Sequence, residues 1–292
     1  MAALKSAAHP RGAARVALTA NAWLVFIFLY APIVLLTVLS FNDSRLVGEW
    51  QGATLEWYRD MLGDRAVKNS IWVSIKVMLL STVVATVLGT MAAISLERFR
   101  WKGRKAFDAL LYLPIIIPDV TMAVMMLLFF VQFFDIIDAV VGTQYRLGLN
   151  TIVLSHIAFN ISFVSVVVRA RLASLDDNLE EAASDLYASR WQAFRHVTLP
   201  LIAPGVAGGA LLAMTISLDD VVVTSFVAGP GATTLPVYVF GLVKRGVTPL
   251  INAVSVVMLL ASILLVLASL VFQRWSAGRE TTEIAKIGGT TK

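Results

Sequence analysis

Six long apolar segments dominate the pattern of hydrophobic and polar positions along the chain. Each is a continuous run of about 20 residues or more, the length that an α-helix needs to cross a hydrocarbon core of about 30 Å. Strands of a membrane barrel would instead alternate apolar and polar positions in shorter segments. The pattern therefore predicts an all-α integral membrane protein with six transmembrane helices, at residues 20–40, 70–96, 107–134, 149–169, 203–224 and 251–272.

The composition agrees with this pattern. The 292 residues are 58% hydrophobic and only 15% charged, and the mean hydropathy is +0.78. Soluble domains have about 25% charged residues, so a soluble globule and a disordered chain are both excluded. The net charge of +5 is divided among the segments between the apolar runs, which excludes a nucleic-acid-binding face. The chain has no cysteine, which excludes disulfides, thiol chemistry and a cysteine zinc site.

Basic residues are unevenly divided between the two sides of the predicted helices. With the N-terminus inside, the cytoplasmic segments hold 16 Lys and Arg residues and the outer loops hold seven. Cytoplasmic loops are enriched in these residues, so we expect both termini in the cytoplasm. The membrane domain then covers residues 20–272, between an N-terminal segment over 1–19 and a tail over 273–292. The tail lacks hydrophobic periodicity, and we expect it to be disordered.

The outer loop over residues 42–69 is amphipathic. It holds Trp50, Trp57 and Tyr58 among charged residues. Aromatic residues of this kind form belts at the membrane interface, so the loop either lies on the membrane or docks an external partner.

The inner loop over residues 171–200 predicts two short amphipathic helices. Apolar residues recur at helical spacing up to Leu186, and a second pattern with Trp191 and Phe194 follows Ser189 and stops before Pro200. These apolar faces have no evident cover within the chain. They either lie on the inner leaflet or insert into a groove on a cytoplasmic partner.

The same inner loop resembles a known signature. Its motif residues are Glu181-Ala182-Ala183, then Tyr187, Val197 and Leu199-Pro200. This is the spacing of the EAA signature, which marks the permease subunits of bacterial ABC importers. The family has Gly at position 187 and Ile at position 197. A non-Gly residue in a left-handed turn costs about 1–2 kcal/mol, so either the turn at Tyr187 is right-handed or its partner has adjusted to it.

Further segments resemble the second permease of polyamine importers of the putrescine or spermidine type. They begin at Tyr30, Ser40, Leu113, Ser217 and Ser225, and read YAPI, SFNDS, LPIIIPDV, SLDDV and SFVAGPGATTLP. The resemblance implies a type I ABC importer permease fold in a bacterial inner membrane. It also implies a homologous second permease, two cytoplasmic ATPase subunits and a periplasmic polyamine-binding protein as partners, with the EAA residues coupling the spans to the ATPases.

The chain lacks residues for catalysis. An ATPase needs a glycine-rich phosphate loop ending in Lys-Ser or Lys-Thr, and none is present. The three histidines, His9, His156 and His196, are far apart, so we expect no metal site and interpret His156 as a packed, hydrogen-bonded residue. The chain is therefore predicted to be neither an enzyme nor a cofactor-binding protein. The resemblance implies that the partner ATPases bind ATP and Mg.

Carboxylates within the predicted spans are costly in a membrane and point to function. Asp119 follows a proline in the third span, where it either caps the next half-helix or lines the substrate path. Asp219 and Asp220 are adjacent in the fifth span and so face directions about 100° apart. Helical spacing places Asp220 on one face with Ser217 and Thr224. We expect Asp220 first and Asp219 second to guide a cation, the alternative being a structural charge between helices.

The sequence thus predicts the membrane permease of a polyamine importer, for putrescine first or else spermidine. A permease of the same family for another cation or small solute remains an alternative. A self-sufficient secondary transporter or channel would act alone and usually shows inverted repeats, which we do not see. A membrane scaffold would not need the acidic pair at 219 and 220.

Overall fold

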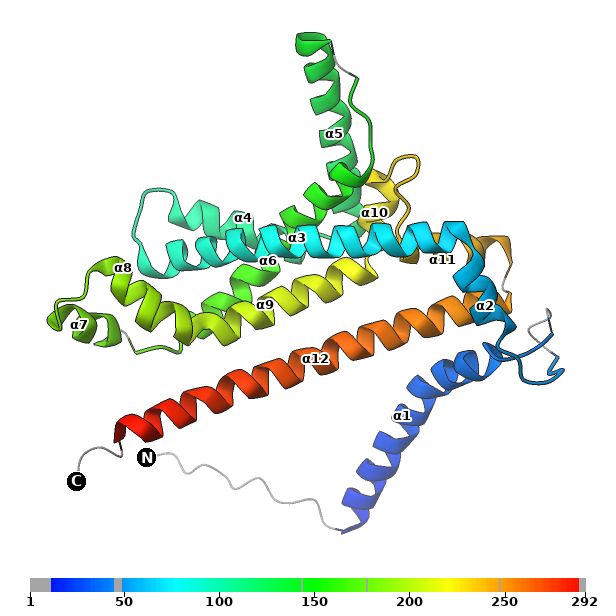
Figure 1. Ribbon diagram of the computed structural model, residues 1–292, viewed down its shortest axis with the longest axis horizontal. Helices are drawn as coiled ribbons and strands as arrows, with labels where there is room; N and C mark the ends of the chain where they lie inside the picture. Colours follow the sequence, from blue (N-terminus) through cyan, green and yellow to red (C-terminus); the bar gives the residue numbers. More distant parts are fainter. Residues whose placement is uncertain (1–11, 45–48, 143, 177, 247, 289–292) are drawn as a thin grey trace. The chain divides into compact units, whose positions relative to one another are not determined.

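The structure, a computed structural model, describes residues 12–44, 49–142, 144–176, 178–246 and 248–288 (Figure 1). It divides into two compact units, one formed by Met1–Gly63 and Gly246–Val257 and the other by Asp64–Arg245 and Met258–Lys292. The helices are α1 (Gly12–Leu39), α2 (Glu56–Gly63), α3 (Arg65–Arg98), α4 (Arg104–Ile116), α5 (Asp119–Val141), α6 (Leu149–Leu172), α7 (Asn178–Asp185), α8 (Arg190–Ala193), the π-helix η1 (Phe194–Thr198), α9 (Leu199–Asp219), α10 (Val222–Val227), α11 (Leu235–Arg245) and α12 (Pro249–Gly288).

Six helical stretches of the described residues are long and apolar enough to cross a membrane. This number confirms the prediction of an all-α protein with six membrane helices. The stretches are Ala14–Leu39, Arg65–Arg98, Asp119–Val141, Leu149–Leu172, Arg190–Asp219 and Pro249–Ala268.

The third predicted span, 107–134, is divided into two helices, as expected from a half-helix that starts at Asp119, and only the stretch Asp119–Val141 is long enough to cross a membrane. The chain leaves the helical conformation at Ile117 (φ −71°, ψ 133°) and Pro118 (φ −57°, ψ 137°), so α4 and α5 are separate helices. Proline has no N–H to donate and disfavours the helical conformation in the residue before it. The resulting short helix α4 packs against α6, where Arg169 Nη1 lies 2.5 Å from Asp108 Oδ1.

The fifth predicted span, 203–224, is wrong at both ends. Helical structure already begins at Arg190, and Pro200 does not stop it. The five-residue π-helix η1 precedes this proline, and in it the N–H of Leu199 donates to the carbonyl of Phe194. A π-turn is wider than an α-turn and accommodates the proline ring. At the other end α9 stops at Asp219, because Asp220 is extended (ψ 125°) and α10 begins two residues later.

The C-terminal segment also differs from expectation. Helix α12 continues to Gly288, although we expected a disordered tail from residue 273. The stretch 273–288 contains no proline, and an established helix gains one hydrogen bond for each residue added. Residues 289–292 of the tail and residues 1–11 of the N-terminal segment lie outside the described residues.

The second unit is built on the crossing of α3, α6 and α9. Glycines allow these helix backbones to approach closely, as small residues do in membrane proteins. A Cβ atom at Gly89 of α3 would lie 2.8 Å from Cβ of Val164, and one at Gly209 of α9 would lie 3.2 Å from Cγ1 of Val164. Other buried residues here are Ala93, Val168, Leu172, Ile202 and Ala213.

A further apolar cluster of the second unit lies where α5 and α10 pack together. The packing of α5 against α10 places the break between α4 and α5 near the break between α9 and α10. Helix α11 packs on α3, where the N–H of Leu235 donates to Oγ of Ser74 at 2.8 Å. Buried members of the cluster include Met122, Phe130, Phe159, Val223 and Val227.

In the first unit, the loop between α1 and α2 is folded around Asn42, which is 1% exposed. Its Nδ2 donates to the carbonyl of Glu49, its Oδ1 accepts from the N–H of Gln51, and its carbonyl accepts from Nε1 of Trp57. Asn42 also forms an isolated antiparallel bridge with Ala53. The outer loop is therefore an ordered element in its described residues, which its amphipathic pattern alone did not predict.

Candidate functional site

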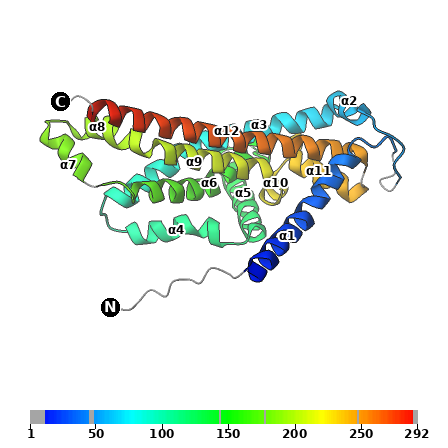
Figure 2. The same ribbon diagram turned by 90° about the horizontal axis from the view of Figure 1, so that it is seen from below.

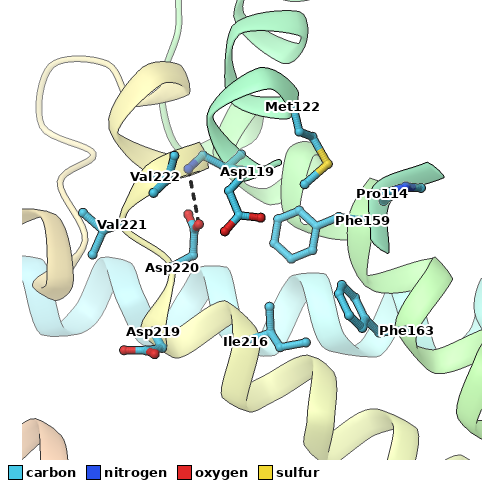
Figure 3. A pocket seen from close by; sticks show the side chains of 11 residues that line it. Pro114, Asp119, Met122, Phe159, Phe163, Ile216, Asp219, Asp220, Val221 and Val222 are labelled. Atoms are coloured by element: carbon cyan, nitrogen blue, oxygen red, sulfur yellow. Dashed lines mark hydrogen bonds between the residues drawn. The ribbon is translucent and has the colours of Figure 1, made fainter. Parts of the chain in front are cut away.

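The two helix breaks and α6 border a cavity of about 350 Å³ (Figure 3). Non-helical backbone at membrane depth is tolerated where it lines a cavity. The wall combines three carboxylates with apolar and aromatic side chains. It is formed by Pro114, Asp119, Met122, Phe159, Phe163, Ile216, Asp219, Asp220, Val221, Val222 and Val223.

Asp220 caps α10 (Figure 3). One carboxylate oxygen accepts from the N–H of Val223 at 3.2 Å, and the other accepts from both the N–H and the hydroxyl of Thr224 at 2.7 Å. The carboxylate satisfies backbone N–H groups that a helix start leaves free. Asp220 therefore has most of its hydrogen-bonding capacity occupied within the chain.

His156 of α6 holds this cap from the other side. Its ring is fully buried, and Nε2 lies 3.0 Å from Oγ1 of Thr224 and 3.4 Å from Oδ2 of Asp220. The ring also contacts that of Phe159, with 5.0 Å between centroids. The prediction that His156 is a packed, hydrogen-bonded residue is confirmed.

Asp119 and Asp219 are the other two carboxylates of the cavity, and both side chains are exposed. Neither forms a side-chain hydrogen bond or ion pair with any residue that the structure describes. Asp119 therefore does not act as a side-chain cap of α5, which was one of its two predicted roles. In Figure 3 the Asp119 carboxylate points towards the space between Asp220 and Phe159, whereas that of Asp219 turns away from both.

The predicted polar face of the fifth span is wrong, because α9 ends before Asp220. Ser217 is 4% exposed and lies in the core, where its Oγ accepts from Nδ2 of Asn160 at 2.7 Å and lies 3.1 Å from Oγ of Ser81. Thr224 belongs to α10 and bonds to Asp220 instead of sharing a continuous helix face with it. Ser217 is thus separated from the cavity wall, whereas the three aspartates are brought together there.

Sequence reasoning missed the contribution of α6 to the cavity. Phe159 and Phe163 line it, and His156 and Asn160 hold the segments around Thr224 and Ser217. Each of these two pairs has a spacing of four residues, which places its members on one side of a helix. That spacing was the signal available in the sequence.

The EAA residues begin on α7, whose C-terminal end has the hydrogen bonds of a Schellman motif. The N–H of Ala188 donates to the carbonyl of Ala183, and the N–H of Tyr187 donates to that of Ser184. Tyr187 itself has φ 63°, the only positive φ of a non-Gly residue among those described. The turn is therefore left-handed, at the position where this motif prefers Gly, and the right-handed alternative is wrong.

Glu180, which sequence reasoning did not single out, connects α7 to two membrane helices. Its Oε1 accepts from Oγ1 of Thr198 at 2.5 Å, just before α9, and lies 3.3 Å from Nη2 of Arg98 at the end of α3. Most of the EAA motif and its neighbours, in contrast, are exposed. Exposed motif residues and neighbours there are Glu181, Ala182, Leu186, Tyr187, Trp191, Leu199 and Pro200, and Val197 is half-buried.

A family model for the inner-membrane component of binding-protein-dependent transport systems matches residues 85–281, more than half of the chain. The chain belongs to this family. The matched region contains both α7 and the residues that line the cavity. The permease is accordingly a multi-pass inner-membrane protein.

Relatives and solved structures agree with this membership. The permease is 42% identical over 235 residues to the putrescine transport system permease protein PotI of Escherichia coli (strain K12), covering 80% of this chain and 82% of the relative. It is 37% identical over 250 residues to the spermidine/putrescine transport system permease protein PotC of the same strain, covering 86% and 91%. A chain of a bacterial ABC transporter involved in the import of the acidic polysaccharide alginate aligns with a TM-score of 0.74 at 19% identity, over 89% of this chain and 94% of that one.

A chain of the MetNI methionine ABC transporter also aligns, with a TM-score of 0.57 at 18% identity, over 71% of this chain and 94% of that one. These structural likenesses confirm the predicted type I ABC importer permease fold. The predicted resemblance to permeases of the putrescine and spermidine type is confirmed by the relatives.

Proposed function

We propose that the permease belongs to an ATP-driven importer that moves polyamines, putrescine first or else spermidine, across the inner membrane. The supporting observation is the identity of 42% and 37%, over most of the chain, to two permeases named for these substrates. Its partners are a homologous second permease, two cytoplasmic ATPase subunits that bind ATP and Mg, and a periplasmic polyamine-binding protein. Both termini lie in the cytoplasm, and the chain itself performs no catalysis.

The chemistry of the cavity supports a polyamine substrate. A diamine carries cationic ends joined by an apolar methylene chain, and it loses water on entering a passage of low dielectric. Asp119 and Asp219 offer carboxylates without partners among the described residues, and each attracts an ammonium group at 4 Å by about 4 kcal/mol at an effective dielectric of 20. Phe159 and Phe163 offer ring faces to the methylene chain or to a cation.

The contacts of α7 support a role in coupling to the ATPases. Leu186 is 83% exposed and Tyr187 is 98% exposed, so this end of α7 has apolar surface available for a groove on a partner. Glu180 joins α7 to the helix that begins at Arg190 and to α3. Closure of the ATPases would then shift α7 together with these spans, and the cavity would alternate between the two sides of the membrane.

Uptake of radiolabelled putrescine by the complete complex in reconstituted vesicles tests this function. We expect Asp119→Asn and Asp219→Asn each to lower uptake at least several-fold, because the change removes the charge and keeps the shape. Binding-protein affinity, complex assembly and basal ATP hydrolysis should stay near those of the unmodified complex. Asp138→Asn, at the far end of α5 and outside the cavity wall, is the matched control and should transport normally.

Asp220→Asn has a different expected result, since this carboxylate also caps α10. We expect it to lower uptake and to weaken assembly as well. Unchanged uptake by all three single variants and by the triple variant would contradict a path through the acidic cavity. Transport of another cation without any transport of polyamine would contradict the substrate and leave the permease role intact.

A further inference from the structure

The connection between α3 and α4 alternates basic and aromatic residues. Residues 98–105 read Arg-Phe-Arg-Trp-Lys-Gly-Arg-Lys, so five of eight carry a positive charge. The segment directly follows a candidate membrane span that ends at Arg98, which places it at a membrane surface. It lies at the same end of α3 as α7 and α8 (Figures 1 and 2).

The segment forms a defined turn. The N–H of Arg104 donates to the carbonyl of Trp101 at 3.3 Å, and Gly103 between them has φ 95°. A positive φ at the third position of a four-residue turn is typical of type II and favours Gly. The Trp101 ring packs on that of Phe107 in the first part of α4, with 5.7 Å between centroids. The basic side chains around this turn are therefore carried on a structured backbone.

The five basic residues fall into two groups. Arg98 lies 3.3 Å from Glu180, and Arg104 lies 3.8 Å from Glu97. The side chains of Arg100, Lys102 and Lys105 are exposed, and none of the three has an ion pair or hydrogen bond with the residues that the structure describes. Three positive charges thus remain available to an anionic ligand.

Apolar surface accompanies these charges. Phe99 is 59% exposed and Trp101 is 41% exposed, and α4 continues with Leu110 at 60% and Ile116 at 72% exposed. Aromatic rings interleaved with basic residues suit the boundary between headgroups and acyl chains, where the ring is apolar and the charge stays in the polar layer. This combination favours lipid over a soluble anion, which would use only the charges.

We propose that the turn over residues 98–105 binds the phosphate groups of anionic phospholipids, through Arg100, Lys102 and Lys105, in the leaflet at which α3 ends. Clusters of four to eight basic residues next to a membrane helix attract anionic lipids in this way. With the N-terminus inside, this leaflet is the cytoplasmic one. The site does not depend on which substrate the permease carries.

Native mass spectrometry of the assembled complex in detergent, titrated with dioleoylphosphatidylglycerol or dioleoylphosphatidylcholine, tests the site. We expect the unmodified complex to retain the anionic lipid preferentially. The triple variant Arg100→Gln, Lys102→Gln, Lys105→Gln should lose at least tenfold in apparent affinity for it. The charge-retaining variant Arg100→Lys, Lys102→Arg, Lys105→Arg should keep the preference. If the triple Gln variant does not assemble, Lys102→Gln alone should still lower the affinity by about fivefold.

A second control variant removes three positive charges from another part of the chain. The variant Arg59→Gln, Arg65→Gln, Lys68→Gln alters three exposed residues before and at the start of α3, and it should keep the lipid preference. An equal loss in this control would overturn the proposal, because net charge and not the turn would then govern binding. Unchanged lipid preference in the Gln variants of the turn would overturn it too. Two further results would assign the turn to another ligand and overturn the proposal. One is displacement of the lipid by inorganic phosphate. The other is that the triple Gln variant of the turn loses the ATPase subunits while its lipid preference stays intact.

Discussion

Replacing Tyr187 by Gly should stabilise the end of α7. Tyr187 has φ 63°, which costs a non-Gly residue about 1–2 kcal/mol. Gly removes this cost but loses more conformational freedom on folding, about 0.5–1 kcal/mol. Because the side chain is 98% exposed, its removal sacrifices little packing. The net gain is about 0.5–1 kcal/mol, which lowers the population of the opened turn about two- to fivefold.

Amide hydrogen exchange over residues 178–189 measures this gain. The amides of Tyr187 and Ala188 form the two hydrogen bonds of the motif, so their exchange should slow about two- to fivefold in Tyr187→Gly. Tyr187→Ala is the control, because it removes the ring and keeps the Cβ atom, and it should show no slowing. Equal or faster exchange in the Gly variant would refute the argument from backbone strain.

Transport by the same two variants separates the backbone from the side chain. If the ring itself contacts an ATPase, both variants should lose putrescine uptake to the same degree. If only the shape of the turn matters, Tyr187→Gly should transport as well as the unmodified permease. The first result is the one expected, because Tyr187 belongs to the exposed apolar surface that α7 is proposed to present to an ATPase.

Three further predictions concern packing, the buried cap and coupling. Gly89→Val should reduce the yield of monodisperse, detergent-extracted protein, because a Cβ there would lie 2.8 Å from Cβ of Val164, and a normal yield would contradict the close packing. His156→Leu should lower uptake more than His156→Gln, because Leu removes one of the two partners of the Thr224 hydroxyl and leaves it with Asp220 alone, at a cost of about 0.5–1.5 kcal/mol. Equal uptake by the two variants would show that the hydrogen bond from His156 is unimportant. Glu181→Lys should uncouple ATP hydrolysis from uptake while insertion stays normal, and coupled transport by this variant would exclude α7 as the coupling element.

The acidic residues show how far sequence reasoning reached at the site. Asp119, Asp219 and Asp220 stood out because a carboxylate in an apolar span is costly, and the structure places all three at one cavity. Asp220 was placed before Asp219 as the residue that guides the cation because a continuous helix would put it on a polar face. That face does not form, because α9 ends at Asp219. The Asp220 carboxylate bonds to Thr224 instead, with His156, 64 positions earlier in the chain, packed beside it. A helical projection cannot include such a partner.

The number of membrane helices and the EAA spacing could be predicted from the sequence alone, because both are local properties. The thickness of the bilayer sets the length of an apolar run, and the signature is a pattern within one loop. The break at Asp220, the pairing of Glu180 with Arg98, and the position of Ser217 in the core were decided by the tertiary structure. At each of these positions a polar side chain has a partner far along the chain: Arg98 beside Glu180, Asn160 beside Ser217 and His156 beside Asp220. The packing of α3, α6 and α9 determined which partner was within hydrogen-bonding distance.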